Sequence, residues 1–125
     1  MKNKRINRIS EEVRRVVSDL ILNGLKDPRI SKMASVTSVE VTRDLSFANI
    51  YISVLGNDLE KENTILGLES AKGYIRNEIG NRIDLRHVPE PIFHLDETIE
   101  NAMYMSELID KVAKKEKDTR GNGNE

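Results

Sequence analysis

Apolar and polar residues alternate with the period of a helix in the first part of the chain. The apolar positions, at steps of three and four, are Ile6, Ile9, Val13, Val16, Val17, Leu20 and Ile21. This spacing predicts an amphipathic helix with one buried stripe. Gly24 and Asp27-Pro28 follow, and proline disfavours helical geometry in the residue before it. We therefore expect the helix to end near Gly24 and residues 24–34 to form a surface loop.

The period changes to two over residues 36–42 and 47–55, which predicts a pair of strands. The apolar face comprises Val39, Val41, Ala48, Ile50, Ile52 and Val54. The chain has no Asn-Gly pair between the strands, so the hairpin turn over residues 43–46 should be longer than two residues. The opposite face carries Glu40, Thr42, Asn49, Tyr51 and Ser53. We expect that face to be solvated or to touch a partner.

Helical periodicity returns over residues 59–83, but Ala71-Lys72-Gly73 interrupts it. Glycine in a helix costs about 1 kcal/mol relative to alanine, and its missing Cβ lets another backbone approach. We therefore predict a kinked pair of helices whose exposed joint contacts RNA. The alternative is a tolerated surface glycine. Tyr74 fits a base-stacking residue and a half-buried packing residue equally well.

A short apolar run over residues 92–95 follows Pro89 and Pro91. Because proline lacks the amide that a sheet ladder uses, we expect an edge strand, joined to the hairpin by a parallel, right-handed crossover. Asp96 or Thr98 is positioned to cap a last helix. Its apolar stripe, which we expect to cover remaining core surface, comprises Ile99, Ala102, Met103, Ile109 and Val112.

These elements predict an α+β fold in the order helix, strand, strand, kinked helix pair, strand, helix, with a three-stranded mixed sheet. This order matches the KH module of the second type, although Ala71-Lys72-Gly73 stands where its Gly-x-x-Gly loop would lie. A chain of 125 residues is sufficient for one domain, which we place at residues 1–113. Residues 114–125 are almost wholly charged, Gly or Asn, so we expect a disordered tail.

Sequence motifs for catalysis are missing. The chain has no Gly-rich phosphate loop, no Gly-x-Gly-x-x-Gly and no His-Glu-x-x-His. His87 and His94 have no second ligand at metal spacing, and the order of Asp44, Ser46 and His87 does not support a hydrolytic triad. We therefore expect no enzyme, no cofactor and no metal site. Without cysteine or a long apolar stretch, the protein is expected to be soluble and cytoplasmic, without a membrane partner.

The charge distribution is uneven although the formal net charge is only -1. Residues 1–15 contain six basic and two acidic residues, a local balance of +4. Cations at a helix start oppose the macrodipole, and a bound phosphate would reverse that penalty. The alternative is a solvated, frayed terminus. The candidate RNA-binding residues, which we expect to form one surface, are Lys4, Arg5, Arg8, Arg15, Ala71, Lys72, Gly73, Arg76, Arg82 and Arg86.

Several segments in order resemble the ribosome-binding factor A family. They are Asp27-Pro28-Arg29, residues 39–45, 48–56, 67–76 and 85–90, and Asp96 with Thr98-Ile99. The resemblance implies a KH-like fold with an Ala-x-Gly kink. It also implies binding of ribosomal RNA near the neck and decoding region, with RNA contact on the first helix and on Ala71, Lys72, Gly73 and Arg76. Asn49 departs from the family, whose members often have lysine there.

The resemblance further implies a non-enzymatic assembly factor that acts late in maturation of the small ribosomal subunit, supports processing of the RNA ends and aids growth in the cold. We expect its partners to be the immature subunit and its ribosomal RNA, without a small-molecule substrate, and the protein to be a monomer. The alternative is a protein-interaction module that uses the exposed sheet face.

Overall fold

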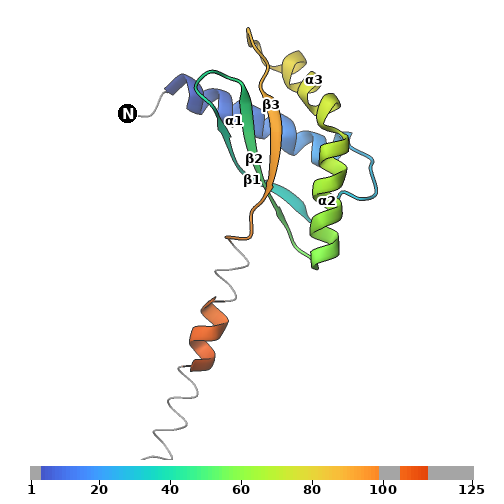
Figure 1. The fold of residues 1–125 in the computed structure, drawn as a ribbon, viewed down its shortest axis with the longest axis vertical. Helices are drawn as coiled ribbons and strands as arrows, with labels where there is room; N and C mark the ends of the chain where they lie inside the picture. Colours follow the sequence, from blue (N-terminus) through green and yellow to red (C-terminus); the bar gives the residue numbers. More distant parts are fainter. Residues whose placement is uncertain (1–3, 99–104, 113–125) are drawn as a thin grey trace, which may run out of the picture.

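The computed structural model describes residues 4–98 and 105–112. Its elements are α1 (Lys4–Asp19), η1 (Leu20–Gly24), β1 (Ala34–Val41), β2 (Phe47–Val54), α2 (Asp58–Ser70), α3 (Lys72–Arg82) and β3 (Glu90–Leu95). The three strands lie in the order β1-β2-β3 (Figure 1). β2 pairs with β1 in antiparallel and with β3 in parallel orientation. The α+β class, the mixed sheet and the edge position of β3 are thereby confirmed.

The first helix ends at Gly24, as its sequence predicts, but its last turn is wider than an α-helical turn. The amide of Leu25 donates to the carbonyl of Leu20, at 2.7 Å, so η1 closes a five-residue π-helical turn. Leu20 is fully buried within it. Apolar spacing alone cannot distinguish this turn from an α-helical turn, because both keep Leu20 on the core side.

β1 begins two residues before its predicted start and contains a β-bulge. The register pairs Ala34 with Val54 and Val36 with Ile52, then shifts between Val36 and Ser38. The extra residue, Thr37, lets Val36 and Val39 share the inner face despite their odd spacing. The hydroxyl of Thr37 donates to the Asp96 carboxylate at 2.6 Å, so the bulge also anchors the segment that follows β3.

The hairpin turn is longer than two residues, as predicted. Thr42 and Phe47 close it, with the Thr42 amide donating to the Phe47 carbonyl at 2.9 Å. Asp44 accepts from the Ser46 amide and the Thr42 hydroxyl, which lowers the pKa of its carboxyl. Leu45 has a φ of 61°, an uncommon conformation for a side chain of this size, and its side chain is buried.

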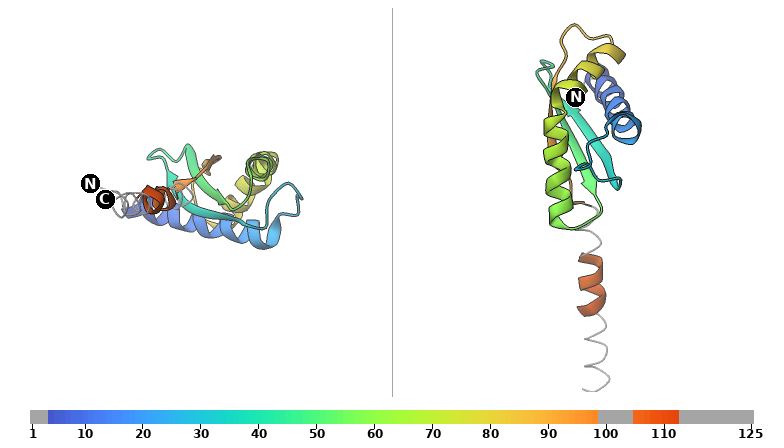
Figure 2. Two further views of the ribbon diagram at one scale, coloured as in Figure 1. Left: turned by 90° about the horizontal axis from the view of Figure 1, so that it is seen from below. Right: turned by 90° about the vertical axis from the view of Figure 1, so that its right-hand side faces the viewer.

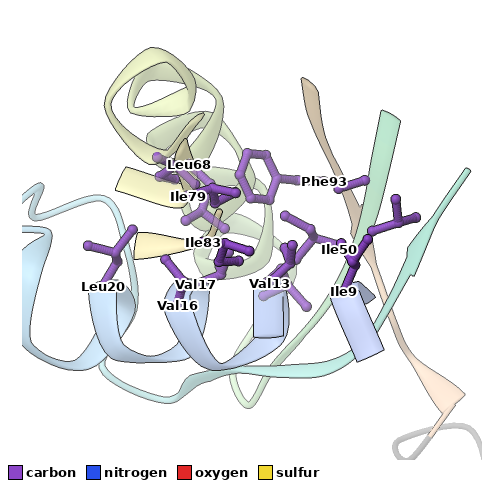
Figure 3. Packing of buried hydrophobic residues seen from close by; sticks show 14 of the residues in the cluster. Ile9, Val13, Val16, Val17, Leu20, Ile50, Leu68, Ile79, Ile83 and Phe93 are labelled. Atoms are coloured by element: carbon purple, nitrogen blue, oxygen red, sulfur yellow. The ribbon is translucent and has the colours of Figure 1, made fainter. Parts of the chain in front are cut away.

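The helices cover one face of the sheet, and the core lies between them (Figure 2). The inner face of β2 contributes Ala48, Ile50, Ile52 and Val54, all essentially unexposed. Figure 3 shows side chains of α1, α2 and α3 converging on this face. Full burial of one such side chain is worth about 1.5–3 kcal/mol. The single buried cluster among the described residues therefore fixes how α1 and α3 lie on the sheet.

The outer sheet face is less solvated than its sequence predicts. Ser53 is only 8% exposed. The rings of Tyr51 and His94 stack, with their centroids 4.9 Å apart. His94 Nε2 lies 2.9 Å from Asn49 Oδ1. Ser53 is therefore buried rather than solvated, whereas Asn49, Tyr51 and His94 are half-buried. That this face as a whole is solvated or touches a partner stays a prediction.

The kinked helix pair is confirmed. Ala71, with φ -91° and ψ 4°, ends α2 and precedes α3. The predicted stripe continues across the joint, since Leu68, Ile75 and Ile79 are fully buried. At the other end of α2, Asn57 and Glu60 form a capping box in which each side chain accepts from the other residue's amide.

Residues 105–112 form a helix, but they do not cover the core. All of them are exposed, including Ile109 and Val112. The prediction that this helix covers core surface is wrong for the part that the structure describes. Ile99, Ala102 and Met103 lie outside the described residues, as do residues 114–125. The single domain over residues 1–113 and the disordered tail stay predictions.

Candidate nucleic-acid interface

The start of α1 is rich in basic residues. Lys4, Arg5 and Arg8 are exposed, and no acidic residue lies in that turn. Among the residues that the structure describes, Lys4 and Arg8 have no ion-pair partner. The unpaired amides and the positive end of the helix dipole add to the same field. This end of α1 is suited to hold an anion.

One helical turn further on, part of the charge is neutralised. Glu11 forms an ion pair with Arg14 and lies 3.9 Å from Arg15. The hydrogen bond from Arg14 lowers the pKa of the Glu11 carboxyl. Arg15 keeps a side chain that is 74% exposed. The predicted excess of charge therefore belongs mainly to the first two turns of α1.

The kink exposes the backbone at Gly73. No heavy atom lies within 4 Å of the point where a Cβ of residue 73 would be. A Cβ at Gly67, by contrast, would meet Ile30 Cγ1 at 2.7 Å. Packing inside the chain thus requires glycine at position 67 but not at position 73. The open space at Gly73 admits an outside backbone, and it fits a tolerated surface glycine equally well.

Two side chains flank that glycine. Lys72 Nζ lies 3.2 Å from Glu69 Oε2, so its charge is partly offset. Tyr74 is 50% exposed, and its ring is therefore available for stacking without being fully solvated. Ala71 is half-buried against the core. At the kink, a ligand would meet Gly73, Lys72 and Tyr74 before it met Ala71.

The basic residues of α3 have different surroundings. A terminal nitrogen of Arg76 donates to the Val88 carbonyl at 3.1 Å, and no carboxylate of the described residues pairs with Arg76. Arg82 binds the carboxylates of Asp19 at 2.7 Å and Glu78 at 3.1 Å. The hydrogen bond from Arg82 lowers the pKa of the Asp19 carboxyl. The Arg82–Asp19 pair also joins the end of α1 to the end of α3. Arg82 is therefore a weaker candidate for phosphate contact than Arg76.

The hairpin turn links α1 to the loop before β3. The Val41 amide donates to the Ser10 hydroxyl at 3.1 Å. On its other side, the Glu90 amide donates to the Ser46 carbonyl at 2.9 Å. Arg43 in this turn and Arg86 in the loop over residues 83–89, which precedes β3, are both exposed. Sequence reasoning missed Arg43, although its place in the predicted turn between two strands was a signal of exposure.

The predicted cations do not form one compact patch. Figure 1 places the start of α1 and the α2–α3 kink at opposite ends of the helical layer, and the first view in Figure 2 agrees. The prediction of a single surface is therefore wrong in that form. The contacts described above connect the two regions through α3, the loop over residues 83–89 and the hairpin turn. We use the name basic band for the basic residues that these segments carry, namely Lys72, Arg76, Arg86, Arg43, Arg8, Arg5 and Lys4.

The neighbouring helix has the opposite charge. α2 carries Asp58, Glu60, Glu62 and Glu69 against Lys61, a balance of -3. α3 carries three basic residues against Glu78, a balance of +2. A phosphate chain that contacts Gly73 is thus repelled by α2 and attracted along α3. The electrostatics favour a path that runs from the kink towards Arg86.

The described residues offer little for other chemistry. His87 makes no contact with Ser46 or Asp44, whose polar groups serve the hairpin turn. Within residues 4–98 and 105–112, no group of three potential ligands could hold a metal ion. In the same residues, no helix has the length and apolarity needed to cross a membrane. The basic band is the strongest candidate site in this part of the chain.

Comparisons with known proteins identify the family of the chain. The model of the family "Ribosome-binding factor A" matches residues 5–109. Ribosome-binding factor A of Clostridioides difficile is 55% identical over 111 residues, which cover 89% of this chain and 86% of that protein. The protein from Alkaliphilus metalliredigens is 53% identical over 116 residues, or 93% and 84% of the two chains.

Solved structures show the same fold. The solution structure of the Thermotoga maritima protein, described as a putative ribosome binding factor A, has a TM-score of 0.68 and 31% identity, and covers 80% of this chain and 94% of that one. A Thermus thermophilus ribosome binding factor A model, fitted into the map of a 30S complex, has a TM-score of 0.60 at 19% identity, with 73% and 94% coverage. The chain has the KH-like fold and belongs to the ribosome-binding factor A family.

Proposed function

We propose that this protein is a non-enzymatic assembly factor that binds the immature small ribosomal subunit through its ribosomal RNA. It acts late in maturation, supports processing of the RNA ends and aids growth in the cold. The protein works in the cytoplasm as a monomer and needs no small-molecule substrate. Family membership supports the ribosome as its partner, and a model of the T. thermophilus ribosome binding factor A has been fitted into the map of a 30S complex.

The observation that carries this proposal is the unneutralised part of the basic band together with Gly73. Lys4, Arg8 and Arg86 have no acidic partner among the described residues. Cations of this kind neutralise phosphates and release counterions, which supplies most of the affinity in contacts without sequence readout. Gly73 lets a ribose-phosphate backbone come close to α3. RNA shape and phosphate position are therefore recognised, rather than base sequence.

Charge reversal tests the proposal directly. The variant carries Glu in place of Arg5, Arg8, Lys72 and Arg76, all of them on helix surfaces. Its far-ultraviolet circular dichroism should match that of the wild type, while co-sedimentation with immature small subunits should be lost. Unchanged co-sedimentation of the folded variant would contradict the proposal.

A matched control addresses net charge alone. Lys26 and Lys32 are exposed in the loop over residues 25–33, are not members of the basic band, and form no ion pair among the described residues. Their double reversal to Glu alters the net charge as much as reversal of Arg5 and Arg8. We expect Lys26→Glu with Lys32→Glu to bind nearly as well as the wild type. Arg5→Glu with Arg8→Glu should bind much more weakly.

The sheet-face interaction module has less support. Its outer face is occupied by internal contacts between Tyr51, His94 and Asn49. A protein partner on that face would be sensitive to Tyr51→Ala and insensitive to reversal of Arg8. The same co-sedimentation assay separates the two functions, because it can be run on both variants.

A further inference from the structure

A groove with an apolar lining lies between η1, the loop over residues 25–33 and α2. Its volume is about 590 Å³, and Figure 1 shows the loop running beside α2. The apolar part of the lining comprises Ile21, Leu22, Leu25, Pro28 and Ile30. The lining shares no residue with the basic band. The groove therefore offers apolar surface that the proposed RNA contact does not use.

Leu22 is the most exposed large apolar side chain among the described residues, at 75%. The core uses Leu20, which is fully buried, and the π-helical turn places Ile21 and Leu22 in the groove wall instead. An apolar centre with a polar rim is the usual composition of a protein–protein interface. Leu22 and the groove are thus suited to receive an apolar side chain from another protein.

The loop that forms one wall of the groove is held against α2. The Ser31 amide donates to the hydroxyl of Thr64 in α2 at 3.1 Å, and Thr64 is fully buried. Ile30 lies so close to α2 that a Cβ at Gly67 would meet it at 2.7 Å. A wall fixed in this way has little conformational freedom to lose when a ligand binds. The groove is therefore preformed.

The rim of the groove carries positive charge that the described residues do not neutralise. Both carboxylates in the lining are engaged within the chain, since Asp27 pairs with Arg29 at 2.6 Å and Glu60 closes the capping box of α2. Lys26 and Lys32 also line the groove, are exposed and have no ion-pair partner in the part of the chain that the structure describes. Two such lysines beside apolar surface are complementary to carboxylates beside an apolar side chain.

We propose that this groove binds a segment of a partner protein in which apolar side chains are flanked by carboxylates. The apolar side chains pack against Leu22 and Ile30, and the carboxylates pair with Lys26 and Lys32. RNA phosphates could pair with the lysines but would leave the apolar lining in contact with water, so the combination favours a protein. This inference goes beyond the RNA-binding proposal and does not depend on it.

A peptide titration tests the groove directly. The probe is acetyl-Glu-Asp-Leu-Glu-Phe-Asp-Glu-amide, added to the isotopically labelled full-length protein and followed by nuclear magnetic resonance. We expect the amide signals of Leu22, Lys26 and Lys32 to shift. Two comparison peptides, one with Ser for Leu and Phe and one with Lys for every acidic residue, should each bind about tenfold more weakly. No shift of those signals at about 1 mM of the acidic peptide, or equal affinity for all three peptides, would overturn the proposal.

Variants of the groove and of the basic band separate the two surfaces. Lys26→Glu with Lys32→Glu should weaken binding of the acidic peptide about tenfold, and so should Leu22→Ser. All three positions are exposed, so the fold should persist, which circular dichroism checks. The matched control, Arg5→Glu with Arg8→Glu, changes the net charge equally and should keep peptide binding. Equal affinity of the two double variants for the peptide would overturn the groove proposal, whereas unchanged subunit binding by the Arg5 and Arg8 variant would contradict only the RNA-binding proposal.

Other occupants of the groove are tested in the same experiment. Oligouridylate in place of the peptide should leave the signals of Leu22 and Lys32 unchanged, and so should dilution of the protein alone. Shifts caused by oligouridylate but not by the peptide would make the groove a phosphate site and overturn the proposal. Shifts of the same signals on dilution would show that a second copy of the chain occupies the groove, which would overturn it as well.

Discussion

Gly73→Ala separates the stability of the kink from its role in binding. Gly73 is the second residue of α3, and a Cβ there meets no heavy atom within 4 Å. Alanine therefore fits without strain and restricts the unfolded chain, which should stabilise the protein by about 0.4–1 kcal/mol. For a domain of this size, that raises the melting temperature by about 2–6 °C. Thermal unfolding followed by circular dichroism measures this shift.

The same methyl group should weaken RNA binding. If a ribose-phosphate backbone lies against Gly73, the Cβ occupies space that the ligand uses. We expect the dissociation constant for immature small subunits to rise about tenfold, which corresponds to about 1.4 kcal/mol. Increased stability with reduced binding is an outcome that general damage to the fold cannot produce.

Gly67→Ala is the matched control for the kink. Its Cβ would lie 2.7 Å from Ile30 Cγ1, so the loop that carries Ile30 must move. We expect a lower melting temperature for this variant. If Gly73→Ala also lowered the melting temperature, the packing argument would be wrong. If Gly73→Ala bound subunits as well as the wild type, Gly73 would be a tolerated surface glycine.

Three further outcomes are expected. Hydrogen bonds from Thr37 and Thr98 lower the pKa of Asp96 below its ordinary 3.8. The stability that the Asp96 carboxylate contributes is therefore present above pH 3.8 and is lost as the pH falls through the lowered pKa. In urea titrations, the unfolding free energy of Asp96→Asn should fall less in acid than that of the wild type. Arg8→Gln should reduce the salt slope of RNA binding by about 0.7, whereas Arg82→Gln should reduce it less because carboxylates already neutralise Arg82. Ile50→Ala, at an unexposed core position, should lower the unfolding free energy by about 2–5 kcal/mol in urea titrations.

The periodicity of apolar residues predicted most of the fold, because the apolar residues repeat where the helices and strands face the core. The stripe through Leu68, Ile75 and Ile79 continues across the kink, so its spacing revealed one helical face on both sides of Ala71. The bulge at Thr37 was missed because an inserted residue breaks strict alternation. The side-chain contacts on the outer sheet face were missed for another reason. His94 reaches Tyr51 and Asn49 from a strand distant in sequence, and pairing of that kind leaves no local pattern.

The candidate site was predictable in part. Charge counting identified Arg8 and Lys72, since a run of basic residues is visible in the sequence. It could not show that Arg82 is neutralised by Asp19, which lies 63 residues away along the chain. Nor could it show that the kink and the start of α1 lie apart. Those facts depend on how α1 and α3 pack on the sheet.

The most direct test of phosphate recognition is the salt dependence of binding to immature small subunits. The dissociation constant of the wild-type protein is measured across a salt series, and the logarithm of the association constant is plotted against the logarithm of the salt concentration. Each phosphate of single-stranded RNA that is neutralised contributes about -0.7 to the slope. Contacts along the basic band predict a slope steeper than about -2, equivalent to about three phosphates. A slope near zero would contradict phosphate contact as the basis of binding.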